Sequence, residues 1–315
     1  MTQRRGWLDV AEVGSVWGIR FVVLLCSAFG RRSARAFLRV IVFYYVLMNA
    51  GARRASRAYF QHVHARSIVV PFAGAAYQDS GRATFGMVFR HFCTFAEVAL
   101  DRLLIASGKR TPFEVSSTGR AHLTTLAQQK RGAILLGAHL GSFEAMRLGA
   151  SSQSLPINMV VNFSNAQRLQ AVLEQLDPSS TTRFISVAGE PLQFVLQIRE
   201  CIERGEMVAI LADRFGADAR TSEADFLGGR ARFAAGPFIL AAALRCPVYL
   251  TFGLYGGKNR YDLHCEHFAD VIELPRKQRE QALAATVQRY ADRLASYVTR
   301  APYNWFNFFD FWGQS

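Results

Sequence analysis

The segment Gly137-Ala138-His139-Leu140-Gly141-Ser142-Phe143-Glu144 brings a histidine and a carboxylate together at a spacing that suits proton transfer. A neutral imidazole at His139 can accept a hydroxyl proton, and a carboxylate at Glu144 can fix its tautomer and stabilise the imidazolium that forms. Gly137 and Gly141 would let a short loop turn the two side chains toward each other. The alternative is a loop histidine beside a solvated glutamate that caps a helix. The pattern therefore predicts general base chemistry on a hydroxyl.

Four further residues form a second candidate set, for binding an anionic group of a substrate. Asp213 and Arg214 follow a predicted strand, and Arg230 and Arg232 flank the loop before Gly236. Guanidinium groups can hold a phosphate or an oxyanion, which makes the three arginines substrate-binding candidates. Asp213 belongs to the same set, and we expect it to pin its loop rather than to act in catalysis. The alternative for the arginines is solvated surface charge.

The remaining histidine and glycine patterns are weaker. His62-x-His64 contains metal-ligand residue types, and so does the segment His264-Cys265-Glu266-His267. A regular strand would turn His264 and His267 to opposite faces, which disfavours a shared metal ion. The Gly-Gly pairs match neither a phosphate loop nor a dinucleotide fingerprint, and the sequence has no G-x-S-x-G nucleophile elbow. We therefore expect neither a metal ion nor a bound cofactor.

The elements that must position these residues alternate between strand and helix from about residue 131 onward. Buried strands are predicted at 133–137, 157–161, 184–187, 207–211 and 247–252, and an edge strand is predicted around 261–267. Helices are predicted at about 142–148, 165–176, 191–205, from 236 onward and at about 276–300. The predicted fold class is therefore α/β, with a central, largely parallel mixed sheet flanked by helices. His139 then lies at the carboxyl end of a strand, where open α/β sheets bind their ligands.

The first seventy residues differ from the rest, because they are apolar and arginine-rich together. Two apolar runs, within 17–29 and 37–48, are each followed by arginines: Arg31, Arg32, Arg35 and Arg39 after the first, and Arg53, Arg54 and Arg57 after the second. This alternation is typical of helices that lie in or dip into a bilayer surface. We predict a membrane-associating helical segment at 1–70 and a second domain at 71–315. The alternative is a buried helical hairpin.

The charge balance predicts an anionic partner. The formal net charge is +13 and the isoelectric point is near 10.0, which suits nucleic acid, acidic phospholipid or an acidic carrier protein. The excess lies mainly in the apolar N-terminal region, which favours lipid and argues against nucleic acid. The sequence has no run of eighteen uninterrupted apolar residues, which argues against a polytopic membrane protein.

Several motifs, in order along about residues 130 to 255, resemble those of a known enzyme family. His139-x4-Glu144 is similar to the H-x4-D/E signature of the glycerolipid acyltransferase superfamily, and its flanks resemble the lipid A lauroyl/myristoyl acyltransferase branch. Later blocks also resemble that branch: Ala212-Asp213-Arg214 with arginine in place of the usual glutamine, Phe226-Leu227-Gly228, Gly236-Pro237 with Leu240-Ala241, and Pro247-Val248. The segments around residues 14–57 and 304–312 resemble a subgroup associated with aryl polyene lipid assembly.

The resemblance implies a fatty acyl transfer from an acyl-carrier-protein thioester to a hydroxyl of a lipid or glycolipid, at the cytoplasmic face of a bacterial inner membrane. In that reading His139 deprotonates the acceptor and Glu144 orients His139. Alternatives are a lysophosphatidate or phosphoinositol-mannoside type acyltransferase, and a non-catalytic basic protein that binds a membrane surface. The aromatic tail from Trp305 to Trp312 is expected either to pack on the core or to insert at the membrane interface.

Overall fold

The protein is built around one mixed sheet. The computed structural model describes residues 16–65, 82–106, 113–146, 155–161, 183–187, 190–216 and 219–313. Within these ranges seven strands form the sheet, in the order β1-β9-β8-β2-β5-β3-β4. They are β1 (Glu114–Thr118), β2 (Ala133–Gly137), β3 (Ile157–Val161), β4 (Arg183–Ser186), β5 (Met207–Leu211), β8 (Val248–Gly257) and β9 (Arg260–Ala269). Strands β8, β2, β5, β3 and β4 run parallel, and β9 is antiparallel to β8. The predicted α/β class is confirmed.

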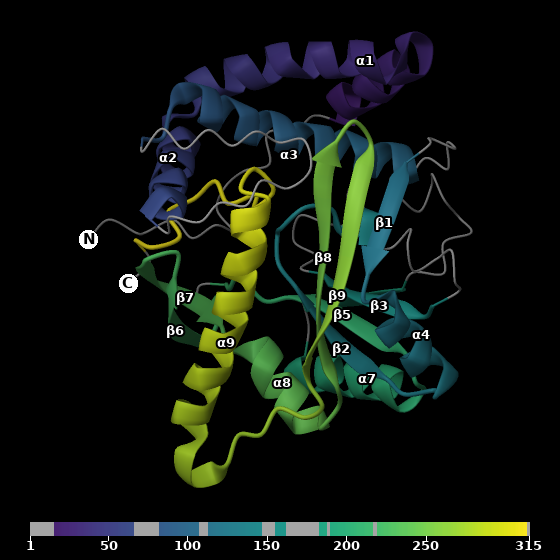
Figure 1. Ribbon diagram of the computed structural model, residues 1–315. Coiled ribbons are helices and arrows are strands. Elements are labelled where there is room, and N and C mark those ends of the chain that lie inside the picture. The colour runs from purple at the N-terminus through teal and green to yellow at the C-terminus, as the bar shows by residue number, and fades with distance from the viewer. Residues whose placement is uncertain are drawn as a thin grey trace.

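Helices cover both faces of this sheet, because the central strands are apolar on both sides. Every residue of β2 is buried, as expected for a strand inside a parallel sheet. Leu136 and its neighbours on one face pack against α7 (Pro191–Glu203), α8 (Gly236–Leu244) and α9 (Arg279–Arg300). A short 3₁₀ turn (Arg276–Gln278) precedes α9. Leu135 on the other face packs against α4 (Arg120–Gln128) and Phe143. Figure 1 shows α9 to the left of β8 and α4 on the right, on the opposite side of the sheet. The predicted helices at 191–205, from 236 and at 276–300 are confirmed, whereas the one at 165–176 lies outside the described residues.

The prediction that residues 261–267 form an edge strand is half wrong. The strand exists as β9, but β1 pairs parallel with it along its outer side, from Glu114 opposite Arg260 to Thr118 opposite His264. All five residues of β1 are exposed, so its sequence has no apolar alternation by which to recognise it. A second sheet, the hairpin of β6 (Thr221–Phe226) and β7 (Gly229–Ala234), is likewise absent from the predicted elements.

Three helices form a separate layer at one end of the molecule. Helix α1 (Val16–Met48) lies along α3 (Phe85–Ala106), and α2 (Ala50–Ala65) turns away from α1 at the left of Figure 1. Gly30 interrupts α1 with a φ of 77°, which a glycine adopts without strain. The predicted domain boundary near residue 70 lies outside the described residues.

The arginines of α1 divide between the protein and the solvent. Arg31 pairs with the fully buried Asp101 of α3, which also accepts a hydrogen bond of 2.8 Å from the Tyr261 hydroxyl. Arg35 donates to the Tyr255 hydroxyl and to Asn259 in the β8–β9 turn. These two residues therefore tie α1 to the sheet, while Arg32 and Arg39 stay exposed.

One side of α1 is apolar and exposed. Val40, Tyr44 and Met48, four residues apart, are 67%, 66% and 64% exposed. On the other side Val42 and Val46 are buried against α3. Among the described helices none can cross a membrane alone; Gly30–Met48 and Ala50–Ala65, bent by 95°, meet the length and composition criteria only as a pair. The N-terminal helices are thus partly a buried layer and partly an uncovered apolar surface.

Candidate active site

Strand register brings His139 and Asp213 together. β2 and β5 are parallel neighbours, with Gly137 opposite Leu211. Two residues after the end of each strand comes a polar side chain, His139 after β2 and Asp213 after β5. The ladder extends past the strand ends, since the Ala212 N–H donates to the Gly137 carbonyl at 3.0 Å. His139 and Asp213 therefore emerge side by side at the carboxyl end of the sheet, where such folds place their sites.

The imidazole and the carboxylate form a well-defined hydrogen-bonded pair. His139 Nδ1 lies 2.8 Å from Asp213 Oδ1, and the His139 backbone N–H donates to Oδ2 at 3.0 Å. The Trp305 indole Nε1 donates to the same Oδ2 at 3.0 Å. Because an ionised carboxylate only accepts hydrogen bonds, Nδ1 carries the imidazole proton and Nε2 keeps its lone pair. The side chain of His139 is 30% exposed while that of Asp213 is fully buried, so substrate can reach only the histidine.

The electrostatics favour a neutral imidazole beside an ionised carboxylate. Burial lowers the pKa of His139, Arg214 and Arg102 lower it further, and Asp213 opposes them. Burial alone would raise the pKa of Asp213, but the adjacent His139, with its hydrogen bonds, and Arg214 outweigh it and lower that pKa to about 2. At neutral pH the site therefore holds the form of histidine that accepts a proton.

The C-terminal segment is hydrogen-bonded to the loop that carries His139. The Phe306 N–H donates to the His139 carbonyl at 2.9 Å, and the Gly141 N–H donates to the Asn304 carbonyl at 2.8 Å. Trp305 is fully buried among aromatic side chains. Packing on the core, one of the two expectations for the aromatic tail, is thus what Trp305 does. No sequence pattern indicated its hydrogen bond to Asp213.

Gly141 is required by the close approach of this loop to β8. It has a φ of 75°, and a Cβ there would lie 2.0 Å from the Gly253 carbonyl oxygen. The adjacent Ser142 N–H donates to that same carbonyl at 2.7 Å. A side chain at residue 141 would therefore push the His139 loop away from the sheet.

Glu144 has a different partner from the one expected. Its Oε1 lies 3.1 Å from the Nε of Arg102 on α3, and its side chain is 5% exposed. The sequence pattern predicted that Glu144 orients His139 and that Asp213 only pins its loop, whereas Nδ1 of His139 is hydrogen-bonded to Asp213. The motif thus supplies a second buried carboxylate near His139, paired with an arginine that no sequence pattern indicated.

The other candidate arginines lie in two places. Arg214 donates to the Phe306 carbonyl and lies over the Phe309 ring, so it joins the site to the tail. Arg230 lies on the exposed side of the β6–β7 hairpin, 3.1 Å from Glu223 and 3.4 Å from Asp225. Arg232 lies on the same strand. The contacts described for Arg230 are those of a surface ion pair.

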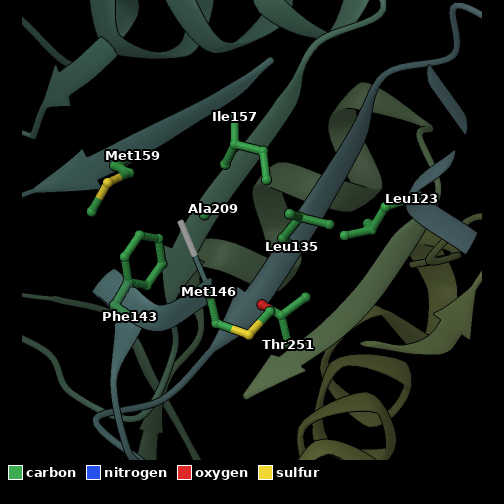
Figure 2. A pocket seen from close by; sticks show the side chains of 8 residues that line it. All are labelled: Leu123, Leu135, Phe143, Met146, Ile157, Met159, Ala209 and Thr251. Atoms are coloured by element: carbon green, nitrogen blue, oxygen red, sulfur yellow. The ribbon is translucent and has the colours of Figure 1, made fainter. Parts of the chain in front are cut away.

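An apolar pocket lies beside the His139 loop. Phe143 and Met146, from the turn of helix that follows the loop, face side chains of four central strands, as Figure 2 shows. The strand residues are Leu135, Ile157, Met159, Ala209 and Thr251, and Leu123 of α4 completes the lining. The hydroxyl of Thr251 is the one side-chain polar atom among these eight, so the pocket suits hydrocarbon.

A match to a known family decides the general nature of the enzyme. The family model for bacterial lipid A biosynthesis acyltransferases matches residues 79–313, about three quarters of the chain. The chain belongs to this family. It is therefore an acyltransferase of lipid biosynthesis, with a lipid as acceptor, which argues against the non-catalytic alternative. Comparison with curated proteins finds no relative that matches the chain.

Proposed function

We propose that this acyltransferase moves a fatty acyl group from an acyl-carrier-protein thioester to a hydroxyl of a lipid or glycolipid, with His139 as general base and Asp213 as its positioning carboxylate. The hydrogen bond of 2.8 Å between Nδ1 and Asp213 Oδ1 supports this assignment most directly. It leaves Nε2 as the one ring nitrogen able to accept a proton.

In the proposed reaction, Nε2 of His139 takes the proton of the acceptor hydroxyl as its oxygen attacks the thioester carbonyl carbon. The tetrahedral intermediate then collapses, the carbon–sulfur bond breaks, and the thiol leaves with the proton from the imidazolium. Asp213 stabilises the imidazolium between the two steps, as the carboxylate does in a hydrolase triad. We propose that the acyl chain lies against the apolar side chains of the pocket in Figure 2, two of which, Phe143 and Met146, follow the His139 loop.

His139→Ala tests the base assignment. The purified variant is assayed for transfer of a labelled acyl group from an acyl-carrier thioester to a bacterial lipid extract. We expect the rate to fall by about 10²- to 10⁴-fold, the usual contribution of a general base. His267→Ala, at an exposed histidine paired with Asp270, is the matched control and should transfer normally. An equal rate in the His139 variant would refute the assignment.

The acceptor is distinguished by the lipid products. Lipid A precursors, lysophosphatidate and phosphoinositol mannosides are the acceptor classes to compare, because each offers a hydroxyl near a phosphate. Mass spectrometry of lipids from cells with and without the protein identifies which class gains an acyl chain.

We also propose that the exposed side of α1 docks on an anionic bilayer at the cytoplasmic face of the inner membrane. Its apolar row of Val40, Tyr44 and Met48 is continued by Phe43, whose ring lies 6.4 Å from that of Phe85 on α3. Exposed arginines lie on the same helix and on the next one: Arg32 and Arg39 on α1, and Arg54 and Arg57 on α2. Apolar side chains beside arginines are the combination that binds a lipid interface.

Liposome sedimentation tests this docking. Replacing Val40, Tyr44 and Met48 together by glutamine should weaken binding to phosphatidylglycerol vesicles by about tenfold or more, since even one apolar side chain that becomes fully buried contributes about 1.5–3 kcal/mol. The control is Leu192→Gln with Leu196→Gln on α7, two comparably exposed leucines. Equal binding by the triple variant, or equal binding of the wild type to neutral phosphatidylcholine vesicles, counts against the proposal.

A further inference from the structure

Arg102 stands at the edge of the active site and is not used in the proposed proton transfer. It belongs to α3, and its Nε lies 3.1 Å from Oε1 of Glu144, five residues after His139. The Glu144 side chain is 5% exposed, whereas that of Arg102 is 40% exposed. The ion pair therefore fixes one side of the arginine to the protein and leaves the rest of it open to solvent.

The same face of α3 borders the His139 loop. Phe95 lies seven residues before Arg102, which is two helical turns and so the same face. Phe95 is 45% exposed, and its ring lies 5.3 Å from that of Phe306, whose backbone N–H donates to the His139 carbonyl. Arg102 also lies close enough to His139 for its charge to lower the pKa of the imidazole.

The charged side chains around His139 differ in how far they are exposed to solvent. Both carboxylates, Asp213 and Glu144, are buried, and Arg214 is engaged with the Phe306 carbonyl and the Phe309 ring. Arg102 and the imidazole are the partly exposed members of this group. A substrate that approaches Nε2 therefore meets a positive charge at the rim, held in place by a buried carboxylate.

We infer that Arg102, positioned by Glu144, is a binding site for a phosphate group of the substrate. The planar donors of a guanidinium group match phosphate oxygens. The inference rests on the proposed function, in which two molecules carry a phosphate: the phosphopantetheine arm of the donor and the headgroup of the acceptor lipid. It gives the glutamate of the H-x4-E motif a role in substrate positioning, separate from the support of His139 by Asp213.

The kinetic test uses Arg102→Gln with two soluble donors of the same acyl chain, acyl-phosphopantetheine and acyl-pantetheine, and a lipid extract as acceptor. A lost charged contact should raise KM about tenfold or more, with kcat changed much less. If the donor phosphate is bound, the rise occurs with acyl-phosphopantetheine alone. If the acceptor phosphate is bound, KM for the extract rises equally with both donors. Arg102→Lys should restore part of the affinity because it keeps the charge.

Two controls keep the result interpretable. Arg199→Gln, at an exposed arginine of α7 paired with Glu203, should leave both KM values unchanged. Because Arg102→Gln leaves Glu144 buried without this cation, the double variant with Glu144→Gln removes that carboxylate charge and should show the same KM rise in a stably folded protein. Unchanged KM values, or a fall in kcat alone, would show that Arg102 only supports the fold.

Calorimetric titration with inorganic phosphate separates this inference from the proposed function. The wild type should bind phosphate, and Arg102→Gln should bind it at least about tenfold more weakly. If the wild type transfers no acyl group, the proposed function fails while this titration still decides the phosphate site. Equal phosphate binding by the two proteins would overturn the inference.

Discussion

Two carboxylates lie near His139, and their contacts assign them different tasks. Asp213 accepts the hydrogen bond of the imidazole, while Glu144 pairs with Arg102. Asp213→Asn should lower kcat by about 10²- to 10⁴-fold, because an amide can turn its N–H₂ toward Nδ1 and favour the wrong tautomer. Glu144→Gln should act mainly on KM.

Steady-state kinetics of the two isosteric variants measure this difference. Thermal unfolding of both proteins serves as the check that each is folded. The opposite result, with kcat lost in Glu144→Gln and retained in Asp213→Asn, would restore Glu144 as the residue that orients His139.

The lowered pKa of His139 predicts a characteristic pH profile. Burial and Arg214 favour the neutral imidazole, so the base stays active below the usual histidine pKa of 6.5. We expect kcat/KM to be constant around neutral pH and to fall only as the pH drops below 6.5. Asp213→Asn removes the charge that raises this pKa, so the residual activity of that variant should fall at a still lower pH. An acid limb above pH 6.5 in the wild type would contradict this account.

At the residue scale, the sequence predicts the identity of site residues more successfully than it predicts their hydrogen-bond and ion-pair partners. His139 is recognisable because it follows a buried apolar strand. Its pairing with Asp213 depends on β2 and β5 being neighbours in register, which is a tertiary fact. Arg102 lies in an apolar helix and Trp305 in an aromatic run, where nothing in the local pattern distinguishes either residue.

At the scale of elements, the loop between β2 and the helical turn at 143–146 depends on one glycine. Gly141→Ala should destabilise the protein by more than about 2 kcal/mol, because the new Cβ adds a backbone clash to the cost of a positive φ. Gly257→Ala is the matched control, since Gly257 has a φ of 81° and no atom lies within 4 Å of the place that an added methyl group would take. The control should cost only about 1 kcal/mol.

Urea unfolding gives the two free energies, and acyl transfer gives the effect on the site. The Gly141 variant should lose activity as well as stability, because the His139 loop must move. Equal destabilisation by the two variants would mean that the contact with Gly253 relaxes without cost.

The burial of each strand decides whether it could be predicted from the sequence. Strands β2, β3 and β5 have their predicted limits because their apolar runs are bounded by polar residues and turns. Strand β1, fully exposed and polar, and the charged β6–β7 hairpin carry no such pattern. Strand β9 alternates as an edge strand does, yet β1 covers its outer side.

At the scale of the whole molecule, His91 joins three parts of the chain. His91 lies on α3. Its Nδ1 is 3.0 Å from Ser56 Oγ of α2, and its Nε2 is 2.8 Å from the Trp305 carbonyl oxygen of the tail. Complete burial lowers its pKa from 6.5 to about 4. Between these pH values the unfolded chain binds more protons than the folded one, so stability is lost as the pH falls from 6.5 to 4.

Because of this single histidine, the free energy of unfolding should fall by about 3 kcal/mol over that range, and by about 2 kcal/mol between about pH 7 and pH 5. Urea unfolding at these two pH values measures the loss. His91→Gln, which cannot take up a proton, should show a smaller loss than the wild type, although His139 and His264 contribute in the same direction. An identical loss in the variant would show that His91 is not buried as a neutral group.

The hydrogen bond from Trp305 to Asp213 also bears on how the enzyme matures. It joins residues 92 positions apart, and the strand-like contact of Leu140 with Trp305 spans a still longer stretch of chain. During synthesis the sheet strands and His139 leave the ribosome well before residues 304–306 do. A nascent chain can thus complete most of its sheet while Asp213 still lacks the hydrogen bond from Trp305. In the proposed mechanism, acyl transfer then begins only after the aromatic segment has docked.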